Sequence, residues 1–430
     1  MRFDMGKLHG KLIRERRKAK KLIQKEKQSK GKLPVVRKTS KQIEVKATKV
    51  GNIRERKGIR CIQPDEAMKV PKCPHGPCLL FTDGIENWFS CSIYRANELC
   101  NYRVTITEGG THDFEDALQI VYTYGLGNSR RTFEETKNKN ELNWCVRCFA
   151  YVSLPHQHPV EKLLKSGDLN LIGKLLKAPK AKNDGEAQYW FTGEVLRVLT
   201  ENLKTFDSIL CIGCPTVAEF MRKAGKKIFV LDYDHRLSNF FDPTQFAHYN
   251  MLSNYFYEAD GVDWTTKFFK NAFRTALVCD PPFGVQFEPL ARSLKKIEDL
   301  HAELNPCGEF TKFLFSPVFM KRFMNGYRML DFKVTYVNHR QFSEKRKTIV
   351  RIFTDMKDLK TFKLQDGYRL CKKCSRYVSD ENEHCKKCNE CATELGPTYR
   401  HCDMCGKCVK PSYKHCITCL RCHLPNRCIK

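Results

Sequence analysis

Short apolar runs alternate with helical patterns through the middle of the chain. The runs are four or five residues long and contain few polar residues, as expected of strands buried on both faces of a parallel sheet. They occupy residues 208–212, 227–231, 276–279 and 311–315. Amphipathic patterns over 187–203 and 217–224 predict helices on either side of the first run. This alternation predicts an α/β fold with a mostly parallel, doubly wound sheet.

The segments outside this alternation have other characters. Residues 334–337 and 348–353 are apolar and close in sequence, which predicts an antiparallel hairpin at the end of the sheet. Residues 1–60 contain too few apolar positions for an independent fold, although residues 8–24 are expected to form a helix on contact with RNA. The composition divides the chain into an arm at 1–60, cysteine-rich units at 65–110 and 140–162, the α/β domain at 185–362 and a cysteine-rich tail at 368–430.

Charge is concentrated at the two ends of the chain. The 430 residues carry a net charge of +28; residues 1–60 hold 22 Lys and Arg against 5 Asp and Glu, and residues 371–430 hold 12 against 6. Such clusters favour a polyanionic partner, because the release of counterions from phosphates drives association. Nucleic acid is therefore the expected partner. A solvated arm that serves solubility or nuclear import is the alternative interpretation of residues 1–60.

The 23 cysteines indicate metal binding rather than disulfides. Many stand in C-x2-C pairs beside histidines, which is typical of zinc sites in a reducing compartment. The N-terminus has no apolar run that would act as a signal peptide, and no stretch approaches the roughly 18 apolar residues of a membrane helix. We therefore expect a cytosolic or nuclear protein without a membrane partner.

The tail contains twelve cysteines and four histidines, enough for four tetrahedral sites of three cysteines and one histidine. An interleaved assignment uses all sixteen: its first and third groups share the spacing C-x2-C-x9-H-x6-C, its second is a looser copy, and its fourth has the spacing C-x2-C-x3-H-x4-C. It groups Cys371, Cys374, His384 and Cys391; Cys385, Cys388, His401 and Cys408; Cys402, Cys405, His415 and Cys422; and Cys416, Cys419, His423 and Cys428. Sequential pairing of neighbouring ligands stays open as an alternative partition. Lysines between these ligands suit phosphates and single-stranded RNA, with protein docking as the other interpretation.

Two further zinc sites are predicted upstream, for a total of about six. The first consists of Cys73, His75, Cys91 and Cys100, with Cys78 as a substitute for His75. The second consists of Cys145, Cys148, His156 and His158.

The motif Asp280-Pro281-Pro282-Phe283 follows the third apolar run and carries candidate chemistry. The lone pair of an adenine N6 amino group is delocalised into the ring, so the nitrogen is a poor nucleophile. The Asp280 carboxylate and the Pro281 carbonyl would accept its hydrogens, orient the lone pair toward a sulfonium methyl group and stabilise the developing positive charge. The prolines restrict the backbone, and Phe283 offers a ring on which an extruded base can stack. A Pro-rich turn capped by an aspartate is the structural alternative.

A methyl donor needs a pocket, and suitable residues stand where the first two runs end. Gly213 allows close backbone approach, and Asp232, nineteen residues later, can accept both hydroxyls of a ribose. Ligands of such sheets bind beyond the carboxyl ends of the strands, so Gly213, Asp232 and Asp280 are expected to share one crevice. The remaining donor-site candidates are Cys214, Pro215, Asp234 as a substitute for Asp232, Asn250, Gln188 and Tyr189.

In their order along the chain these motifs resemble one family. Cys73-Pro74-His75-Gly76-Pro77 with Trp88-Phe89-Ser90-Cys91 and Cys100 is similar to a GRF-type zinc finger; a C2H2-like finger, the Asp-Pro-Pro-Phe motif and a CCHC-type tail follow. The chain thereby resembles the zinc-knuckle rRNA adenine N6-methyltransferases over about residues 65–430. No single motif is decisive, but the order is specific.

The resemblance implies a Rossmann-like class I methyltransferase domain, S-adenosylmethionine as donor and one adenosine of structured large-subunit ribosomal RNA as substrate. It implies that Asp280, Pro281, Pro282 and Phe283 are catalytic, that the fingers build an RNA-binding surface, and that the protein is nuclear or nucleolar, with some cytoplasmic presence. Ribosome-assembly or translation factors are further expected partners. The chain departs from the family pattern at two places. The loop at Gly213 lacks the second glycine of common methyltransferase loops, and three residues rather than four separate Cys419 from His423 in the last knuckle.

Two other functions are compatible with the same residues. Related motifs occur in protein lysine methyltransferases that act on translation components, although the basic arm and the zinc units favour RNA. A non-catalytic ribosome-assembly factor could use a degenerate methyltransferase fold as an RNA platform, but the intact Asp-Pro-Pro-Phe motif argues against it. Binding of the methyl donor would separate an enzyme from a platform.

Overall fold

The computed structural model describes residues 58–93, 100–106, 141–164, 171–176, 188–364, 366–395 and 398–428. Almost all of the predicted basic arm, including the helix expected at 8–24, lies outside the described residues, as do parts of the two N-terminal cysteine-rich units. Among the helices that the structure describes, none is both long enough and apolar enough to cross a membrane.

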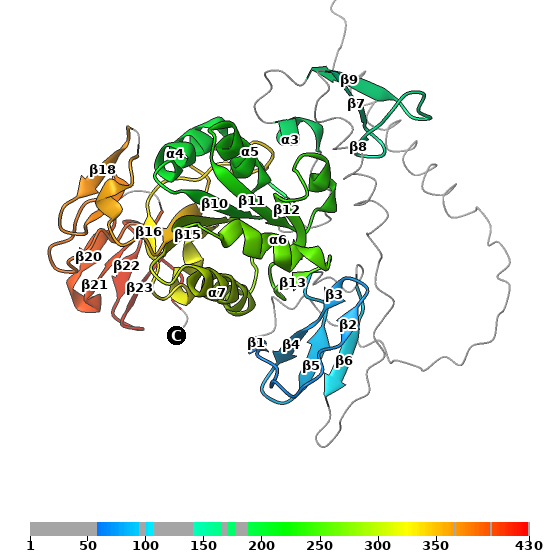
Figure 1. The fold of residues 1–430 in the computed structure, drawn as a ribbon. Helices are drawn as coiled ribbons and strands as arrows, with labels where there is room; N and C mark the ends of the chain where they lie inside the picture. Colours follow the sequence, from blue (N-terminus) through cyan, green and yellow to red (C-terminus); the bar gives the residue numbers. More distant parts are fainter. Residues whose placement is uncertain are drawn as a thin grey trace, which may run out of the picture. The chain divides into compact units, whose positions relative to one another are not determined.

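An eight-stranded sheet forms the centre of the α/β domain, with the strand order β13-β12-β11-β10-β14-β15-β17-β16. Five neighbouring strands are parallel: β12 (Phe246–Asn250), β11 (Lys227–Asp232), β10 (Ser208–Ile212), β14 (Arg274–Cys279) and β15 (Glu309–Pro317). The edges are antiparallel and consist of β13 (Tyr255–Phe256), β17 (Val350–Thr354) and β16 (Arg328–Leu330). The predicted α/β fold with a mostly parallel sheet is confirmed (Figure 1).

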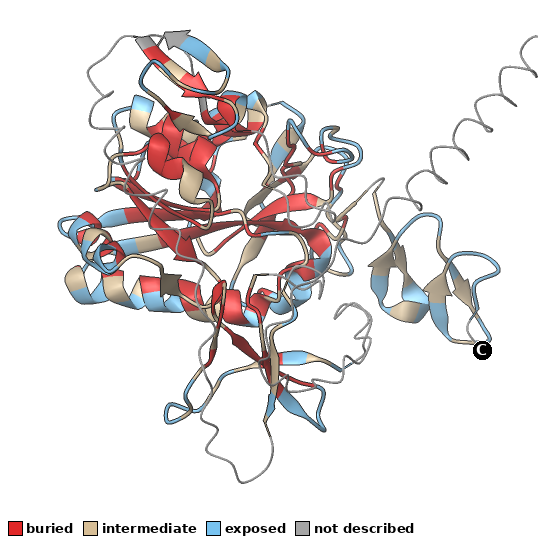
Figure 2. Cartoon of the chain, turned by 90° about the vertical axis from the view of Figure 1, so that its right-hand side faces the viewer, coloured by how far each residue is buried: buried red, intermediate tan, exposed pale blue. Residues whose placement is uncertain are grey.

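Helices cover both faces of this sheet, because the side chains of each parallel strand are apolar on both sides. On β10, Ile209 and Cys211 pack in a cluster with α4 (Gly193–Leu203) and α5 (Pro215–Lys223). The alternate residues Leu210 and Ile212 pack with α6 (Asp260–Phe269) and α7 (Phe287–Leu304) on the other face. Figure 2 shows the strands as a buried layer between helices whose outer sides are exposed.

Two sequence predictions about element boundaries are wrong. The helix expected over 187–203 begins only at Gly193, because the preceding residues are extended and pair with a distant segment. The Thr192 N–H donates to the Thr335 carbonyl at 3.1 Å, and the Val337 N–H donates to the Trp190 carbonyl at 2.7 Å. The strand expected at 334–337 makes these contacts instead of a ladder with β17, whose hairpin partner is β16.

The N-terminal described residues form two small antiparallel sheets. The first has the order β1-β4-β5-β6 and contains β1 (Arg60–Ile62), β4 (Leu79–Thr82), β5 (Asn87–Ser90) and β6 (Arg103–Ile106). The hairpin of β2 (Lys72–Cys73) and β3 (Gly76–Pro77) lies beside it. The second sheet has the order β8-β7-β9 and contains β8 (Ala150–Tyr151), β7 (Glu141–Cys145) and β9 (Val160–Leu164), before the short helix α3 (Leu171–Leu175).

The tail consists of short hairpins. They pair β18 (Tyr368–Cys371) with β19 (Arg376–Ser379), β20 (Arg400–Cys402) with β21 (Lys407–Val409), and β22 (Lys414–Cys416) with β23 (Arg421–His423). Only the first hairpin lies over buried apolar side chains, and no residue of 398–428 is buried. The described 3-10 helices are η2 (His235–Asn239), η3 (Val318–Phe323), η4 (Leu359–Thr361) and η5 (Asp403–Cys405).

Candidate active site and metal clusters

Gly213, Asp232 and Asp280 lie together at the carboxyl ends of three adjacent strands. β10 lies between β11 and β14, so the residues that follow these strands are neighbours. The Gly213 N–H donates to the Leu231 carbonyl at 3.1 Å, and the Asp280 N–H donates to the Ile212 carbonyl at 3.0 Å. The three principal candidates taken from the sequence therefore follow neighbouring strand ends, as expected.

Gly213 is required at its position by both conformation and crowding. Its φ is +69°, and a Cβ atom there would lie 2.8 Å from the backbone oxygen of Asp280 and 3.0 Å from Cε of Met251. A side chain would therefore push the end of β10 away from Asp280. Cys214 begins helix α5 as its N-cap, with Pro215 as the first helical residue. The Cys214 thiol donates to the Val278 carbonyl at 3.2 Å and is buried, so at this loop the backbone is what a ligand could meet.

We predict that Gly213→Ala lowers the affinity for the methyl donor at least tenfold and destabilises the fold by about 1–2 kcal/mol or more, the cost of a left-handed conformation in a residue with a Cβ. Donor titration calorimetry and denaturant unfolding measure the two effects. Gly225→Ala is the matched control, since Gly225 has a φ of +74° but no atom within 4 Å of the added Cβ. Equal donor affinity in the two variants would contradict the role of close approach at Gly213.

Asp232 and Gln188 form a polar pair beside this loop. Gln188 donates from Nε2 to Oδ2 of Asp232 at 3.1 Å, while Oδ1 accepts from the backbone N–H of Asp234 at 2.9 Å. Burial raises the pKa of Asp232 to about 7, against these hydrogen bonds, which lower it. The oxygens of Asp234 are engaged by the Arg236 guanidinium at 2.7 and 2.5 Å. Asp234 is therefore held in an ion pair, whereas the hydrogen bonds to Asp232 come from neutral donors.

Asn250 lies at the end of β12, but its side chain binds protein groups. Its Nδ2 donates to the Ser92 hydroxyl at 2.7 Å, and its Oδ1 accepts from the Leu252 N–H at 3.0 Å. Asn250 is buried, and the contact joins the strand edge to the N-terminal cysteine-rich unit. The sequence gives no signal for this pairing, because Ser92 is 158 residues away.

Aromatic side chains surround the Asp280 carboxylate. The Tyr336 hydroxyl donates to Oδ1 of Asp280 at 2.9 Å. Phe283 stacks on Tyr189 with ring centroids 5.6 Å apart and an interplanar angle of 16°, and it also contacts His339 at 5.7 Å. Burial raises the pKa of Asp280 well above its ordinary value, and the hydrogen bond from Tyr336 opposes that rise. Of the two prolines of the motif, Pro281 is buried and Pro282 is exposed.

Tyr336 and His339 were not among the candidates taken from the sequence. Both lie in the connection between β16 and β17; the sequence predicted a strand at 334–337 but gave neither residue a role in the site. Gln188 and Tyr189, by contrast, were donor-site candidates from the sequence, and they contact Asp232 and Phe283. The chemistry available here is a carboxylate acceptor at a strand end, a neighbouring proline carbonyl and a set of rings that suits a planar base.

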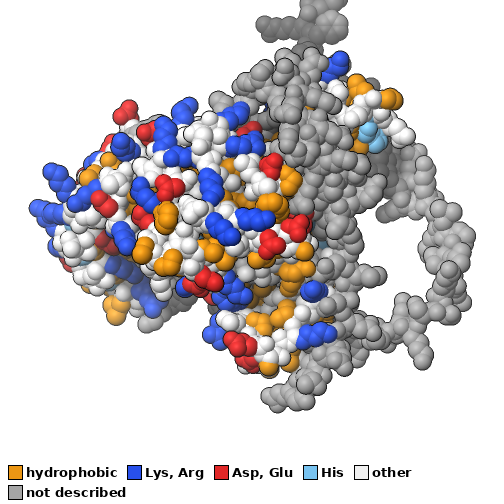
Figure 3. Space-filling view, in the orientation of Figure 1, with side chains coloured by type: hydrophobic (Ala, Val, Ile, Leu, Met, Phe, Trp, Pro, Cys, Tyr) orange, Lys and Arg blue, Asp and Glu red, His pale blue; other side chains and the backbone are white. Residues whose placement is uncertain are grey.

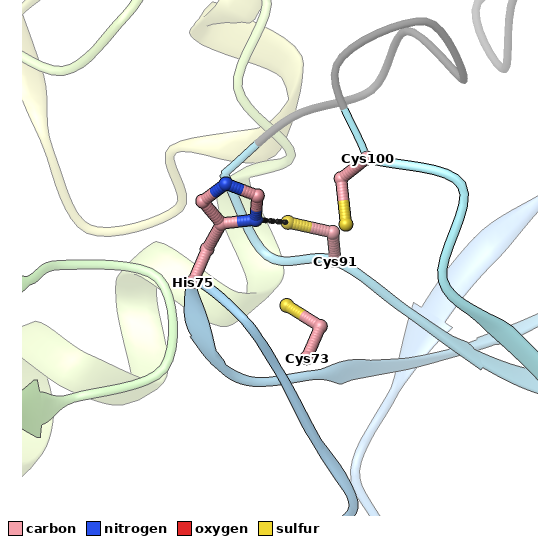
Figure 4. Close-up of side chains that lie close together, drawn as sticks. All are labelled: Cys73, His75, Cys91 and Cys100. Atoms are coloured by element: carbon pink, nitrogen blue, oxygen red, sulfur yellow. Dashed lines mark hydrogen bonds between the residues drawn. The ribbon is translucent and has the colours of Figure 1, made fainter. Parts of the chain in front are cut away.

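The two N-terminal groups of cysteine and histidine converge as the sequence predicts. Cys73, His75, Cys91 and Cys100 lie with all ligand atoms within 4.8 Å of one another, from the β2–β3 hairpin and the ends of β5 and β6 (Figure 4). The second group joins the pair at the end of β7 to the two histidines before β9. Its Cys148 thiol is 3.5 Å from Nε2 of His156 and 3.3 Å from Nδ1 of His158.

The tail ligands converge in the interleaved arrangement. The structure groups Cys371, Cys374, His384 and Cys391; Cys385, Cys388, His401 and Cys408; and Cys402, Cys405, His415 and Cys422. Sγ of Cys416 lies 3.7 Å from Sγ of Cys428, which joins the two ends of the last predicted group.

These distances suit a tetrahedral ion. Zinc bound at about 2.3 Å to sulfur and about 2.0 Å to nitrogen keeps its ligand atoms roughly 3.5–3.8 Å apart. Nδ1 of His384 is 3.6, 3.3 and 3.9 Å from the sulfurs of Cys371, Cys374 and Cys391. Several of the clusters could therefore hold zinc.

Two of these clusters are attached directly to the α/β domain. The Tyr257 hydroxyl donates to the backbone oxygen of His75, next to the edge strand β13. At the opposite edge, Asp331 accepts from the Arg376 guanidinium at 2.9 Å and from Nδ2 of Asn382 at 2.6 Å. Asp331 is 5% exposed, so a buried charge is neutralised by the first tail hairpin. The metal units thus flank the sheet that carries Gly213 and Asp280.

Comparison with known proteins is consistent with this geometry. Residues 182–363 match the family described as "Probable N6-adenine methyltransferase". The chain is 30% identical over 388 residues to the rRNA N(6)-adenosine-methyltransferase ZCCHC4 of Homo sapiens, covering 76% of this chain and 72% of that protein. The proteins of the same name from Xenopus laevis and Bos taurus are each 30% identical, over 356 and 385 residues, with 73% and 75% of this chain and 72% and 71% of theirs covered.

Proposed function

Because the chain belongs to the family of the rRNA N(6)-adenosine-methyltransferase ZCCHC4, we propose that it transfers a methyl group from S-adenosylmethionine to N6 of an adenosine in large-subunit ribosomal RNA. The observation that carries the proposal is the position of Asp280, at the carboxyl end of β14 and against the Gly213 loop at the end of β10. The Asp280 carboxylate and the neighbouring Pro281 thereby lie beside the loop that is proposed to bind the donor.

The donor supplies an electrophilic methyl group on a sulfonium, and the residues of this chain prepare the acceptor. The Asp280 carboxylate and the Pro281 carbonyl accept the two amino hydrogens of adenine, which orients the nitrogen lone pair away from the ring. The same negative oxygens stabilise the positive charge that develops on N6 during transfer. Phe283 provides a face for stacking of the base after it leaves its helix. Asp280 must be ionised for these tasks.

The donor side of the crevice has its own residues. The Gly213 backbone allows close approach, and Asp232, held by Gln188, is the acceptor for the ribose hydroxyls of the donor. Asn250 supports the donor side indirectly, because its side-chain amide links the end of β12 to Ser92. Cys214 and Pro215 shape the loop through their backbone at the start of α5.

The cysteine and histidine clusters are proposed to bind about six zinc ions and to hold the RNA. Their arrangement in short hairpins leaves lysines at the surface between ligands. Among the described residues of the tail, the exposed lysines are Lys372, Lys373, Lys386, Lys387, Lys407, Lys410 and Lys414. On the face drawn in Figure 3, Lys and Arg side chains lie among Asp, Glu and hydrophobic side chains, and the basic ones are available to phosphates. Ribosome-assembly or translation factors are proposed as further partners.

A ribosomal RNA substrate suits a nuclear or nucleolar protein, with some cytoplasmic presence. The basic arm at 1–60 provides residues for import as well as for RNA contact. Microscopy of the full chain with and without the arm tests this part of the proposal: retention in the nucleolus without residues 1–60 would assign localisation to the zinc units instead.

The test of the function is methyl transfer from labelled S-adenosylmethionine to total RNA that lacks the modification. Label recovered as N6-methyladenosine in large-subunit rRNA is the expected result. Label in protein that survives nuclease treatment would favour a protein lysine methyltransferase instead. No transfer together with no donor binding by calorimetry would favour a non-catalytic RNA-binding assembly factor.

A further inference from the structure

The Asp280 carboxylate accepts a hydrogen bond from the hydroxyl of Tyr336. The Tyr336 side chain is fully buried at 0% exposure, and its hydroxyl donates to Oδ1 of Asp280 at 2.9 Å. A buried tyrosine hydroxyl needs a hydrogen-bond partner within the protein, and here the partner is the Asp280 carboxylate, which is proposed to bind the adenine amino group. Resting on the proposed function, we propose that Tyr336 is a positioning residue for methyl transfer: it holds Oδ1 and leaves Oδ2 to accept from the adenine amino group.

The surroundings of Tyr336 fix the direction of its hydroxyl. Its backbone N–H donates to the Phe342 carbonyl at 3.0 Å, and it forms an antiparallel bridge with Phe191. The ring stacks on that of Phe191 with centroids 5.1 Å apart and meets the ring of Phe283 edge-on at 5.7 Å. Rings on two sides leave the phenol little freedom to rotate, so the carboxylate accepts from a donor of fixed direction. Phe283, the proposed stacking ring, is held by the same side chain.

The segment that carries Tyr336 also holds the donor side of the crevice. Oδ1 of Asn338 accepts from the Trp190 N–H at 2.8 Å, and its Nδ2 donates to the Gln188 carbonyl at 3.0 Å. The side chain of Gln188 in turn donates to Asp232 at 3.1 Å. One short segment, residues 336–338, therefore contacts Asp280 directly through Tyr336 and Asp232 indirectly through Asn338 and Gln188. This is the arrangement expected of a segment that sets the distance between the two substrates.

The hydrogen bond also affects when Asp280 is ionised. Burial raises the pKa of Asp280, and the Tyr336 hydroxyl lowers it. Other titratable groups around the site are the thiols of Cys214 and Cys279, whose pKa values burial raises, the Asp232 carboxylate on β11, and the His339 ring, which packs against Phe283 and Tyr336. Loss of the hydroxyl therefore raises the pKa of Asp280, so the acid limb of the pH–rate profile moves to higher pH.

Tyr336→Phe tests the proposal, because it keeps the ring and removes only the hydroxyl. We expect kcat at neutral pH to fall about ten- to a hundredfold, the effect of one hydrogen bond to a charged group. Donor affinity should stay within about twofold, and the acid limb should move to higher pH. Tyr368→Phe is the matched control, since that hydroxyl accepts from the Lys333 N–H at 3.0 Å, away from Asp280. In Asp280→Asn the acid limb should vanish, and adding Tyr336→Phe should not restore it.

Two outcomes overturn the proposal. One is Tyr336→Phe with the kcat and acid limb of the wild type; the other is a lower kcat with an unmoved acid limb and a lower melting temperature, which would assign the tyrosine to packing alone. A carboxyl-carbon NMR titration of Asp280 in RNA-free protein separates this proposal from the function itself. If the wild type labels no RNA, the proposed function fails, yet an unchanged Asp280 pKa in Tyr336→Phe still overturns the role given to the tyrosine.

Discussion

Replacing Asp280 with alanine should lower kcat for RNA methylation by about 100- to 1000-fold, while the donor still binds. The expected size is that of removing one preorganised group from the site of a developing charge. Alanine removes both acceptor oxygens, and the Tyr336 hydroxyl, 2.9 Å away in the wild type, loses its partner. The Pro281 carbonyl remains and keeps a single acceptor. Labelled methyl transfer under saturating donor, with donor affinity from calorimetry, measures the two effects separately.

Asparagine at position 280 distinguishes the acceptor from the charge. It retains one oxygen in place of the carboxylate and carries no negative charge, so its kcat should fall between those of alanine and the wild type. Asp299→Ala is a suitable control, since Asp299 is an exposed acid of α7 that pairs with Lys295. Activity of Asp280→Ala within a few-fold of the wild type would refute the proposed role of the motif. Loss of donor binding in the same variant would instead assign Asp280 to the donor pocket.

Removing zinc should unfold the tail and leave the α/β domain folded. No residue of 398–428 is buried, and its strands are three residues long, so this part of the chain has no apolar core that could hold it together. Structural zinc contributes roughly 10–16 kcal/mol of binding free energy in small domains, which makes metal binding the source of folding. The α/β domain, in contrast, has apolar clusters on both faces of its sheet.

Mass spectrometry of the native protein should find about six zinc ions, and a chelator should remove them with loss of tail amide signals in NMR. The thermal transition of the α/β domain should persist. Cys402→Ser should release the zinc of its own site, while Cys307→Ser, at an exposed cysteine outside the clusters, should release none. A tail that keeps its amide signals without metal would show that another force folds it. RNA affinity should fall in the chelated protein if the tail binds phosphates.

The sequence predicts the centre of this fold well, because local pattern and position agree there. The runs that became β10, β11 and β14 are apolar on both faces, and their order along the chain places Gly213, Asp232 and Asp280 at one edge. The apolar pattern predicted a strand at 334–337 but not the contact of Tyr336 with Asp280, which is 56 residues away in sequence. The contact depends on how that segment packs against 190–192, a tertiary event with no local signal.

The tail shows a different limit. The ligand types were evident from composition, but spacing alone allowed both interleaved and sequential partitions. A left-handed residue follows each C-x2-C pair of the tail, at Ser375, Asn389, Gly406 and Leu420. The same turn follows Cys148 at Phe149, in a cluster that is not interleaved, so this local geometry does not decide the partition. The partition depends on which histidine and cysteine return to each pair, and spacing does not determine that.

Interleaving also determines how the tail can be divided. His384 and Cys385 are neighbours in sequence yet belong to different clusters. Cys388 and Cys391, three residues apart, also belong to different clusters. The three overlapping groups span 371–391, 385–408 and 402–422, so a cut anywhere between residues 371 and 422 separates the ligands of at least one ion. A single protease cut in the tail would therefore leave the ligands of at least one cluster on two chains. No single cluster can be deleted without removing ligands of its neighbour, so a truncation that respects the clusters must remove them together.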